Sequence, residues 1–223
     1  MNFTNSKRDV STIAHELGHS MHSFYSNSCQ NIIDSGYTIM VAEVASTVNE
    51  ILLSDYQIKN EKNPKKKIEI IYELLEMVRA TFYRQSMFAE FEKIVHEKIE
   101  KSEVLSSQDL NDIYYKLNEK YFGKDIIIDK EIQYEWSRIP HFYTDFYVYK
   151  YSIGISAAIC IAEKIINREE GIVEKYISML KQGKMKKSID LLKMVGVDLE
   201  NPETYVKTAK FYQNKINELK SLL

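Results

Sequence analysis

The chain has 223 residues, of which 44% are hydrophobic, enough to fill the core of one large domain or two small ones. Its 30 basic and 32 acidic residues give a net charge of -2, which offers no support for a general nucleic-acid or membrane-surface role. Only 7 glycines and 3 prolines interrupt a sequence rich in Lys, Glu, Ile and Leu. This composition favours long helices with few turns, so we expect a mainly α protein.

Neither the cysteines nor the N-terminal residues point to a secreted or membrane protein. Cys29 and Cys160 form no pair with metal-ligand or redox spacing, so we interpret both as reduced thiols. Residues 1–9 lack the apolar core of a signal peptide, and no stretch of about 18 apolar residues exists to span a membrane. We therefore expect a cytoplasmic location.

The first two helices are predicted from caps and periodicity. Ser6, followed three residues later by Asp9, can cap a helix that ends near Ser26. A polar loop over residues 27–36 leads to a second helix over about 37–55. Apolar residues recur at helical spacing in both, namely Val10, Ile13, Ala14, Leu17, Met21 and Phe24 in the first helix and Val41, Val44, Val48, Ile51 and Leu52 on the buried face of the second.

Helical spacing also dominates the rest of the chain. Residues from Pro64 to about Lys101 form one very long helix or two stacked ones, and Ser106 with Asp109 caps a further helix that Gly123 ends. Residues 125–129 fit either a short strand or an apolar loop. No repeat, low-complexity segment or linker divides the chain, so we predict one domain over residues 1–223. Further helices are expected over 143–168, 172–182, 188–195 and from 202 to the end.

A metal-binding motif lies in the first predicted helix. His15-Glu16-Leu17-Gly18-His19 has the form H-E-x-x-H. Residues four apart on a helix point the same way, so His15 and His19 can reach one cation while Glu16 lies beside an open coordination position. His22 cannot join them as a third ligand, because it lies about 10 Å from His15 along the axis and zinc–nitrogen bonds are about 2.1 Å long. We interpret His22 as a structural residue or one that supports a ligand.

The third ligand must therefore come from another element. On the second helix, Glu43, Ser46, Thr47 and Glu50 form a polar stripe opposite the apolar face. Periodicity alone predicts that this stripe faces solvent. A catalytic zinc held by two histidines needs one more protein ligand, however, and the Glu43 carboxylate would complete the set and leave one position open. Glu50, two turns further on, is placed to orient a ligand.

Several longer stretches resemble the oligoendopeptidase F family of zinc oligopeptidases, which is distantly similar to thimet oligopeptidase. The stretches follow one another through nearly the whole chain and are Asn2-Phe-Thr, Thr12-Ile-Ala-His-Glu-Leu-Gly-His-Ser-Met-His22, Val41-Ala-Glu-Val-Ala-Ser-Thr47, Arg84-Gln-Ser-Met-Phe-Ala-Glu-Phe-Glu92, His141-Phe-Tyr-Thr-Asp-Phe-Tyr-Val-Tyr-Lys-Tyr-Ser-Ile-Gly154 and Ser188-Ile-Asp-Leu-Leu-Lys-Met-Val-Gly-Val-Asp198. The resemblance implies a multi-helix zincin-like catalytic domain that cuts short peptides internally.

The resemblance also implies roles for individual residues. His15, His19 and Glu43 would bind one zinc ion per chain, and Glu16 would be the general base. A histidine and tyrosines of the His141 segment would contact the substrate and stabilise the oxyanion, with the roles assigned in the order His141 and Tyr151, then Tyr149 and Tyr143. Helical spacing alone would instead pack most of these aromatic residues into the core. Pro140 disfavours helix at Ile139, so His141 is expected at a bend before a helix.

One departure from the family concerns the start of the chain. Family members carry a large N-terminal helical region that forms the other wall of a deep channel, whereas this sequence begins a few residues before the H-E-x-x-H motif. Two interpretations follow. The chain is either a zinc endopeptidase of short peptides in its own right, or an incomplete zinc-binding fragment that needs the N-terminal region or a homo-oligomeric partner. The presence of all proposed catalytic residues favours the first interpretation and the missing region favours the second, and exposed apolar surface would discriminate between them.

Overall fold

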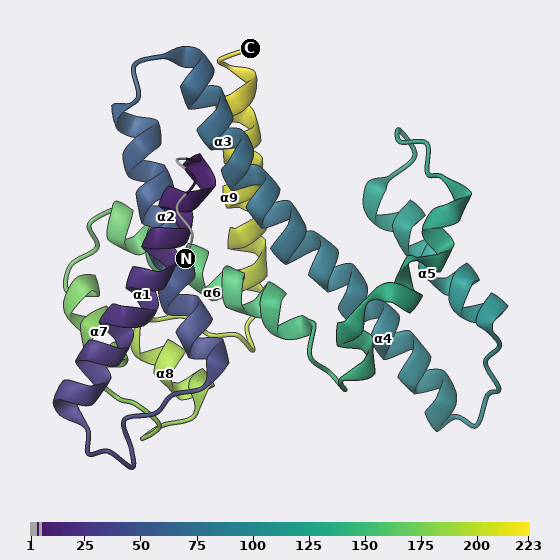
Figure 1. Ribbon diagram of the computed structural model, residues 1–223, viewed down its shortest axis with the longest axis horizontal. Coiled ribbons are helices and arrows are strands. Elements are labelled where there is room, and N and C mark those ends of the chain that lie inside the picture. Colours follow the sequence, from purple (N-terminus) through teal and green to yellow (C-terminus); the bar gives the residue numbers. More distant parts are fainter. Residues whose placement is uncertain (1–3, 5) are drawn as a thin grey trace. The chain divides into compact units, whose positions relative to one another are not determined.

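The computed structural model describes residue 4 and residues 6–223. Within this part of the chain every regular element is a helix, which confirms the prediction of a mainly α protein (Figure 1). None of these helices is long and apolar enough to cross a bilayer. The fold has two compact units, one formed by the described residues up to Val78 together with Ile153–Leu223 and the other by Arg79–Ser152. Asn2 and Phe3, which open the first motif of the resemblance, lie outside the described residues.

The first unit buries the apolar face that the sequence predicts for the second helix. On α2 (Ile39–Asn60), Val41, Val44 and Val48 have no exposed surface and Ile51 is 1% exposed. Small side chains of α6, Ala157, Ala158 and Ala162, are buried equally well. The unit contains α1 (Lys7–Cys29), α2, α3 (Pro64–Val78), most of α6 (Tyr149–Ile166), α7 (Ile172–Leu180), α8 (Ser188–Met194) and α9 (Glu203–Lys220).

The predicted cap of α1 is present as a capping box. The Asp9 backbone N–H donates to Ser6 Oγ (3.3 Å), and the Ser6 backbone N–H donates to Asp9 Oδ2 (2.9 Å). The Thr4 hydroxyl donates to the same carboxylate oxygen. These bonds, from the Ser6 backbone first and then from Thr4, lower the pKa of Asp9 to about 2.

The apolar residues of α1 do not face the core. α1 packs against α2 at Gly18, which meets Ser46 (Figure 1). His22 and Ser26 are also buried, His22 against Tyr37 and Ser26 by a hydrogen bond to the Ser35 carbonyl in the loop before α2. Five of the six predicted apolar positions are 39% to 60% exposed, and the sixth, Ala14, is half-buried. We call these five residues the α1 stripe: Val10, Ile13, Leu17, Met21 and Phe24. The helix buries small and polar residues instead. Apolar periodicity therefore predicts this helix correctly but predicts the wrong side of it to be buried.

The loop between α1 and α2 is tied to the loop between α7 and α8. Gln30 Nε2 donates to the Lys181 carbonyl (2.8 Å), and the Lys184 N–H donates to the Asp34 carbonyl (3.0 Å). Gly183, which has φ of 54°, makes this approach possible, because an added Cβ would lie 2.1 Å from the Asp34 carbonyl oxygen. These contacts fix the connection between the two helices that carry the predicted metal ligands.

The second unit has an aromatic core between α4 (Arg84–Glu100) and α5 (Ser107–Phe122). Phe88, Phe91 and Tyr114 are each at most 4% exposed, and their rings contact one another. The Glu135 carboxylate ties the elements together by accepting hydrogen bonds from Arg84, Arg138 and Tyr114, each 2.6 Å long. The unit also contains the π-helical turn η1 (Arg79–Tyr83), the 3-10 helices η2 (Lys130–Arg138) and η3 (Pro140–Tyr143), and the first turn of α6.

Two segments of the second unit correct or settle the sequence predictions. Residues 125–129 form an irregular loop in which Ile127 is 96% exposed, so the strand alternative is wrong. The helix predicted from about Tyr143 begins only at Tyr149, because Phe146 has φ of 49° and ends any helical continuity from η3. His141 lies in η3 directly after Pro140, at the bend that the proline predicts.

Candidate metal centre

The predicted metal ligands converge on one point between α1 and α2. The Nε2 atoms of His15 and His19 are 3.2 Å apart, and the Glu43 carboxylate lies 3.6 Å from His15 Nε2 and 3.8 Å from His19 Nε2. These atoms form the group of metal-ligating side chains found among the described residues. Donor atoms at about 2.1 Å from a tetrahedral zinc ion are about 3.4 Å from one another. The two imidazoles and the carboxylate therefore fit zinc in both donor type and spacing.

Gly18 allows α1 and α2 to approach closely enough for this convergence. A Cβ at residue 18 would lie 2.5 Å from Ser46 Cα and 3.0 Å from the Ala45 carbonyl oxygen. Ser46 is fully buried at the contact, and its hydroxyl donates to the Glu43 carbonyl (3.0 Å). Gly18 was not singled out from the sequence, and periodicity placed Ser46 in a polar stripe toward solvent, which is wrong for this residue. Gly18 is a small residue next to His19, and Ser46 lies three positions after Glu43.

Glu50 orients His15 from the far side of the ring. Its carboxylate lies 3.1 Å from His15 Nδ1 and also accepts a hydrogen bond from Ser11 Oγ (3.0 Å). The hydrogen bond to Glu50 raises the pKa of His15 most, while partial burial opposes the rise. A proton held at Nδ1 leaves Nε2 with its lone pair directed toward His19 and Glu43. Glu50 thus lies where the sequence placed a residue that orients a ligand.

His22 has a structural position. Its ring is 1% exposed and stacks on Tyr37 with ring centroids 3.6 Å apart and planes 9° from parallel. Burial first, and then the charge of His19, lower the pKa of His22 to about 4. The Tyr37 hydroxyl in turn forms a hydrogen bond with Ser23 Oγ (2.5 Å). The stacking on Tyr37 gives His22 a structural place, apart from the group of His15, His19 and Glu43.

Glu16, the predicted base, follows His15 on α1 and is exposed. Its charge contributes to the raised pKa of His15, so the two groups are near each other. The exposed side chain can reach solvent on the side of α1 that neither Gly18 nor the α1 stripe occupies.

In the second unit, His141 and Tyr151 lie together. The Tyr151 hydroxyl is 3.3 Å from His141 Nε2. The His141 ring stacks on Tyr147 with centroids 5.2 Å apart and planes 2° from parallel, and Tyr147 meets the edge of Tyr151. Tyr147 could not be singled out from the sequence, because the spacing of residues along the chain does not distinguish it from the neighbouring tyrosines.

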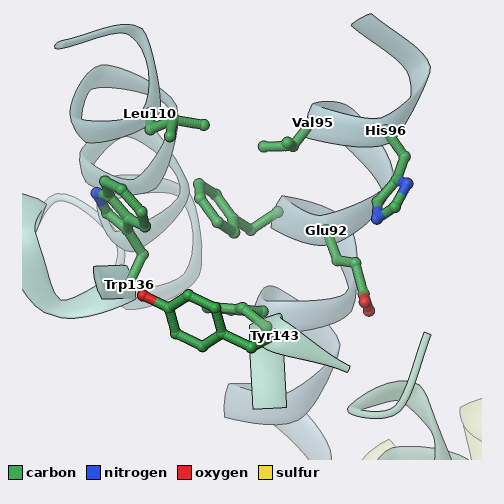
Figure 2. A pocket seen from close by; sticks show the side chains of 8 residues that line it. Glu92, Val95, His96, Leu110, Trp136 and Tyr143 are labelled. Carbon is green, nitrogen blue, oxygen red and sulfur yellow. The ribbon is translucent and has the colours of Figure 1, made fainter. Parts of the chain in front are cut away.

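The other two tyrosines of the segment lie outside this cluster. Tyr149 is 41% exposed, and Tyr143 is 76% exposed and donates from its hydroxyl to the Ser137 carbonyl (3.0 Å). Tyr143 instead lines a pocket of about 130 Å³ with Val95, Leu110 and Trp136 (Figure 2). The structure therefore brings together His141 and Tyr151, but neither Tyr149 nor Tyr143 joins them.

Comparisons with known proteins bear on the whole chain. The model of the family described as Peptidase family M3 matches residues 1–211. Oligopeptidase PepF of Bacillus subtilis is 44% identical over all 223 residues, which correspond to 33% of its length. The plasmid-encoded oligoendopeptidase F of Lactococcus lactis subsp. cremoris is 38% identical over the same 223 residues, 37% of its length.

A solved structure of a relative has the same fold. The crystal structure of oligoendopeptidase-F from Enterococcus faecium matches with a TM-score of 0.85 and 38% identity, over 96% of this chain and 39% of that chain. The chain thus spans 33% to 39% of the length of these relatives. Because the family model covers nearly all of its residues, the chain belongs to peptidase family M3.

Proposed function

We propose that this chain carries the catalytic centre of a zinc-dependent endopeptidase that cuts short peptides internally. The observation that carries the proposal is the convergence of His15, His19 and Glu43 within 4.8 Å, next to the exposed Glu16. Two imidazoles and one carboxylate, with a position left open, are typical of catalytic rather than structural zinc sites, which usually have four protein ligands. The names of the relatives, oligopeptidase and oligoendopeptidase F, support a peptide substrate.

His15, His19 and Glu43 would hold one zinc ion, with His15 oriented by Glu50. A bound zinc ion supplies Lewis acidity, which polarises the scissile carbonyl and makes water easier to deprotonate near neutral pH. Glu16 accepts the proton of the attacking water as the new C–O bond forms. It then passes this proton to the nitrogen of the leaving amine as the C–N bond breaks.

We assign the stabilisation of the negatively charged oxygen to His141 and Tyr151, following the resemblance of their segment. Their side chains are within hydrogen-bond distance of each other, so each can hold the other's donor in a fixed direction. Removing one such donor typically costs about 2.7 to 4 kcal/mol in the barrier. Tyr149 and Tyr143 would contact the substrate peptide further from the reacting bond.

The direct test is hydrolysis of a quenched fluorescent peptide of about eight residues, with zinc quantified in the same sample. We expect about one zinc per chain and cleavage that a chelator abolishes and added zinc restores. Glu16→Gln should keep the zinc and lose hydrolysis, because the amide cannot accept the proton. Glu174→Gln, an exposed acid at the start of α7, serves as the matched control. Turnover by Glu16→Gln at the parent rate would remove Glu16 from the mechanism.

The α1 stripe supports a second candidate function. In this candidate the chain is a zinc-binding part that becomes active only when another polypeptide covers the stripe, either the N-terminal region of the longer relatives or a second copy. Five large apolar residues on one helix face, each at least 39% exposed, form a contiguous helical row that soluble proteins seldom leave uncovered. Bound zinc without cleavage by the 223-residue chain would favour this candidate.

The two candidates differ in how the chain behaves in solution. A self-sufficient enzyme should sediment as a monomer, whereas a chain that needs a partner should associate through the α1 stripe. The substitution of both Leu17 and Met21 by Glu should then abolish association, whereas Val206→Glu, at an exposed site on α9, should not. Activity that appears only above the association threshold would identify a second copy as the partner.

A further inference from the structure

Glu92 is a buried carboxylate with an unusual partner. It lies on α4, is 6% exposed, and its Oε1 accepts a hydrogen bond from the backbone N–H of Phe146 (2.7 Å). Among the described residues, no Lys or Arg forms an ion pair with it. Glu92 also lines the pocket of Leu110 and Trp136, and Figure 2 shows its carboxylate directed away from these two residues. A buried carboxyl group is costly unless it is hydrogen-bonded, and the Phe146 N–H supplies such a bond to Glu92.

The bond holds a backbone conformation that the chain would not adopt by itself. Phe146 has φ of 49°, in the left-handed region that residues other than glycine rarely occupy. Its ring lies against His96, with centroids 4.5 Å apart. Glu92 and His96 are four residues apart on α4 and therefore hold the turn at residues 144–148 from one helix face. Strained backbone of this kind persists where surrounding contacts determine it.

The residue after Phe146 connects this turn to the His141 cluster. Tyr147 lies nearly parallel to the His141 ring and meets Tyr151 edge on. The direction of the Tyr147 side chain depends on the backbone at Phe146, because the two residues share a peptide unit. The bond from Glu92 therefore acts on His141 through Phe146 and Tyr147.

We propose that Glu92 is a positioning residue. It fixes the turn at residues 144–148 so that Tyr147 holds the His141 ring against Tyr151. The link from Glu92 to His141 stands on the geometry of the second unit alone, and only its consequence for turnover rests on the proposed function. Glu92 itself touches neither His141 nor Tyr151 in the chain as described, so its role is exerted through the turn.

The test follows the ring protons of His141 by NMR in the full 223-residue chain. The chain has five histidines, so their signals can be resolved, and the His141→Gln variant identifies the one of interest. Glu92→Leu removes the acceptor and should shift the His141 signals, because the ring loses its fixed place over Tyr147. Glu92→Gln retains an oxygen that can accept the Phe146 N–H and should restore the parent signals. Glu90→Leu, on the same helix but bonded to Lys120 and Tyr121, should leave them unchanged.

Parent His141 shifts in a folded Glu92→Leu variant would overturn the proposal. If that variant does not fold, hydrogen exchange in the parent chain decides instead. We expect the Phe146 amide to be protected by the buried carboxylate, and an amide that exchanges as freely as in a peptide would contradict the anchor.

Measurements of turnover distinguish the positioning role of Glu92 from the role of His141 in the proposed function. Glu92→Leu should lower kcat by about 10- to 100-fold with little change in KM and none in zinc content, as supporting residues of an active site commonly do. If His141→Gln turns over at the parent rate, the role of His141 in the proposed function fails while the NMR result for Glu92 stands. If His141→Gln is inactive and Glu92→Leu is not, the positioning role fails by itself.

Discussion

Gly18→Ala tests whether the close approach of α1 and α2 forms the metal site, because helix propensity and packing predict opposite effects of this substitution on stability. Within a helix, alanine is more stable than glycine by about 0.5 to 1 kcal/mol. The new Cβ would however lie 2.5 Å from Ser46 Cα and 3.0 Å from both Ser46 N and the Ala45 carbonyl oxygen. These neighbours are backbone atoms that cannot rotate away. Overpacking of this kind costs about 1 to 3 kcal/mol, so we expect a net loss of about 1 kcal/mol.

The same clash should weaken metal binding. To restore ordinary contact at 3.4 Å, α1 and α2 must separate by about 0.9 Å at Gly18, since 3.4 minus 2.5 is 0.9. Metal sites tolerate changes in ligand distance of only about 0.2 Å, and His15, His19 and Glu43 come from the two separating helices. We therefore expect zinc affinity to fall at least about tenfold, the lower end of the effect seen when support around a metal site is lost.

Two measurements check this prediction. Urea denaturation in the presence of a chelator gives the unfolding free energy without the contribution of metal, and competition with a chelating dye gives the zinc Kd. Gly154→Ala on α6 is the matched control, because an added Cβ there meets no atom within 4 Å and should stabilise the helix by about 0.5 to 1 kcal/mol. If Gly18→Ala were as stable as the control variant and bound zinc with the parent Kd, the close approach of α1 and α2 would not be what forms the site.

Three further predictions concern the groups around the candidate metal centre. Glu43→Ala should lose zinc, and a stoichiometry equal to that of the parent on elemental analysis would remove Glu43 from the ligand set. Glu50→Leu should keep the fold and weaken zinc binding by about 10- to 100-fold, because His15 loses the acceptor at Nδ1; an unchanged Kd would contradict this. The metal-free chain should lose stability as the pH falls from 6.5 to about 4, because the unfolded chain protonates His22 at its ordinary pKa of 6.5 while burial keeps the folded pKa near 4. This difference corresponds to about 3 kcal/mol, and His22→Phe should remove that part of the slope in urea denaturation at pH 7 and pH 4.5. Equal slopes in parent and variant would show that His22 is not the group responsible.

Much of the helical structure follows from local sequence. The capping boxes at Ser6 and Ser106, the stop at Gly123 and the buried face of α2 all depend on residues within a few positions of one another. The pairing of His15 with His19 belongs to the same class, since one turn of helix is enough to bring them together. Glu43 was reached by a different route, from the coordination that zinc requires and from the resemblance.

Other features depend on contacts between elements that local patterns do not encode. The apolar periodicity of α1 predicts a buried face, yet the helix buries Gly18, His22 and Ser26. Gly18 does so because its Cα approaches the backbone of Ser46 too closely for a side chain, and the other two contact the loop that leads to α2. The turn before α6 contains Phe146 with φ of 49°, and the Phe146 N–H donates to Glu92, which is 54 positions away in the sequence. Tyr147 differs from the neighbouring tyrosines in its stacking on His141, and the spacing of residues in the sequence does not encode this contact.

The sequence by itself therefore determined most of the helices, their caps and the pairing of His15 with His19, because each of these is a property of residues within one or two turns. Only the tertiary structure decided which side of α1 meets α2, that Glu50 contacts His15 and that the His141 ring stacks on Tyr147. The physical reason is that a helix presents several faces of similar composition, and the choice among them depends on the shape and polarity of a partner distant in the sequence.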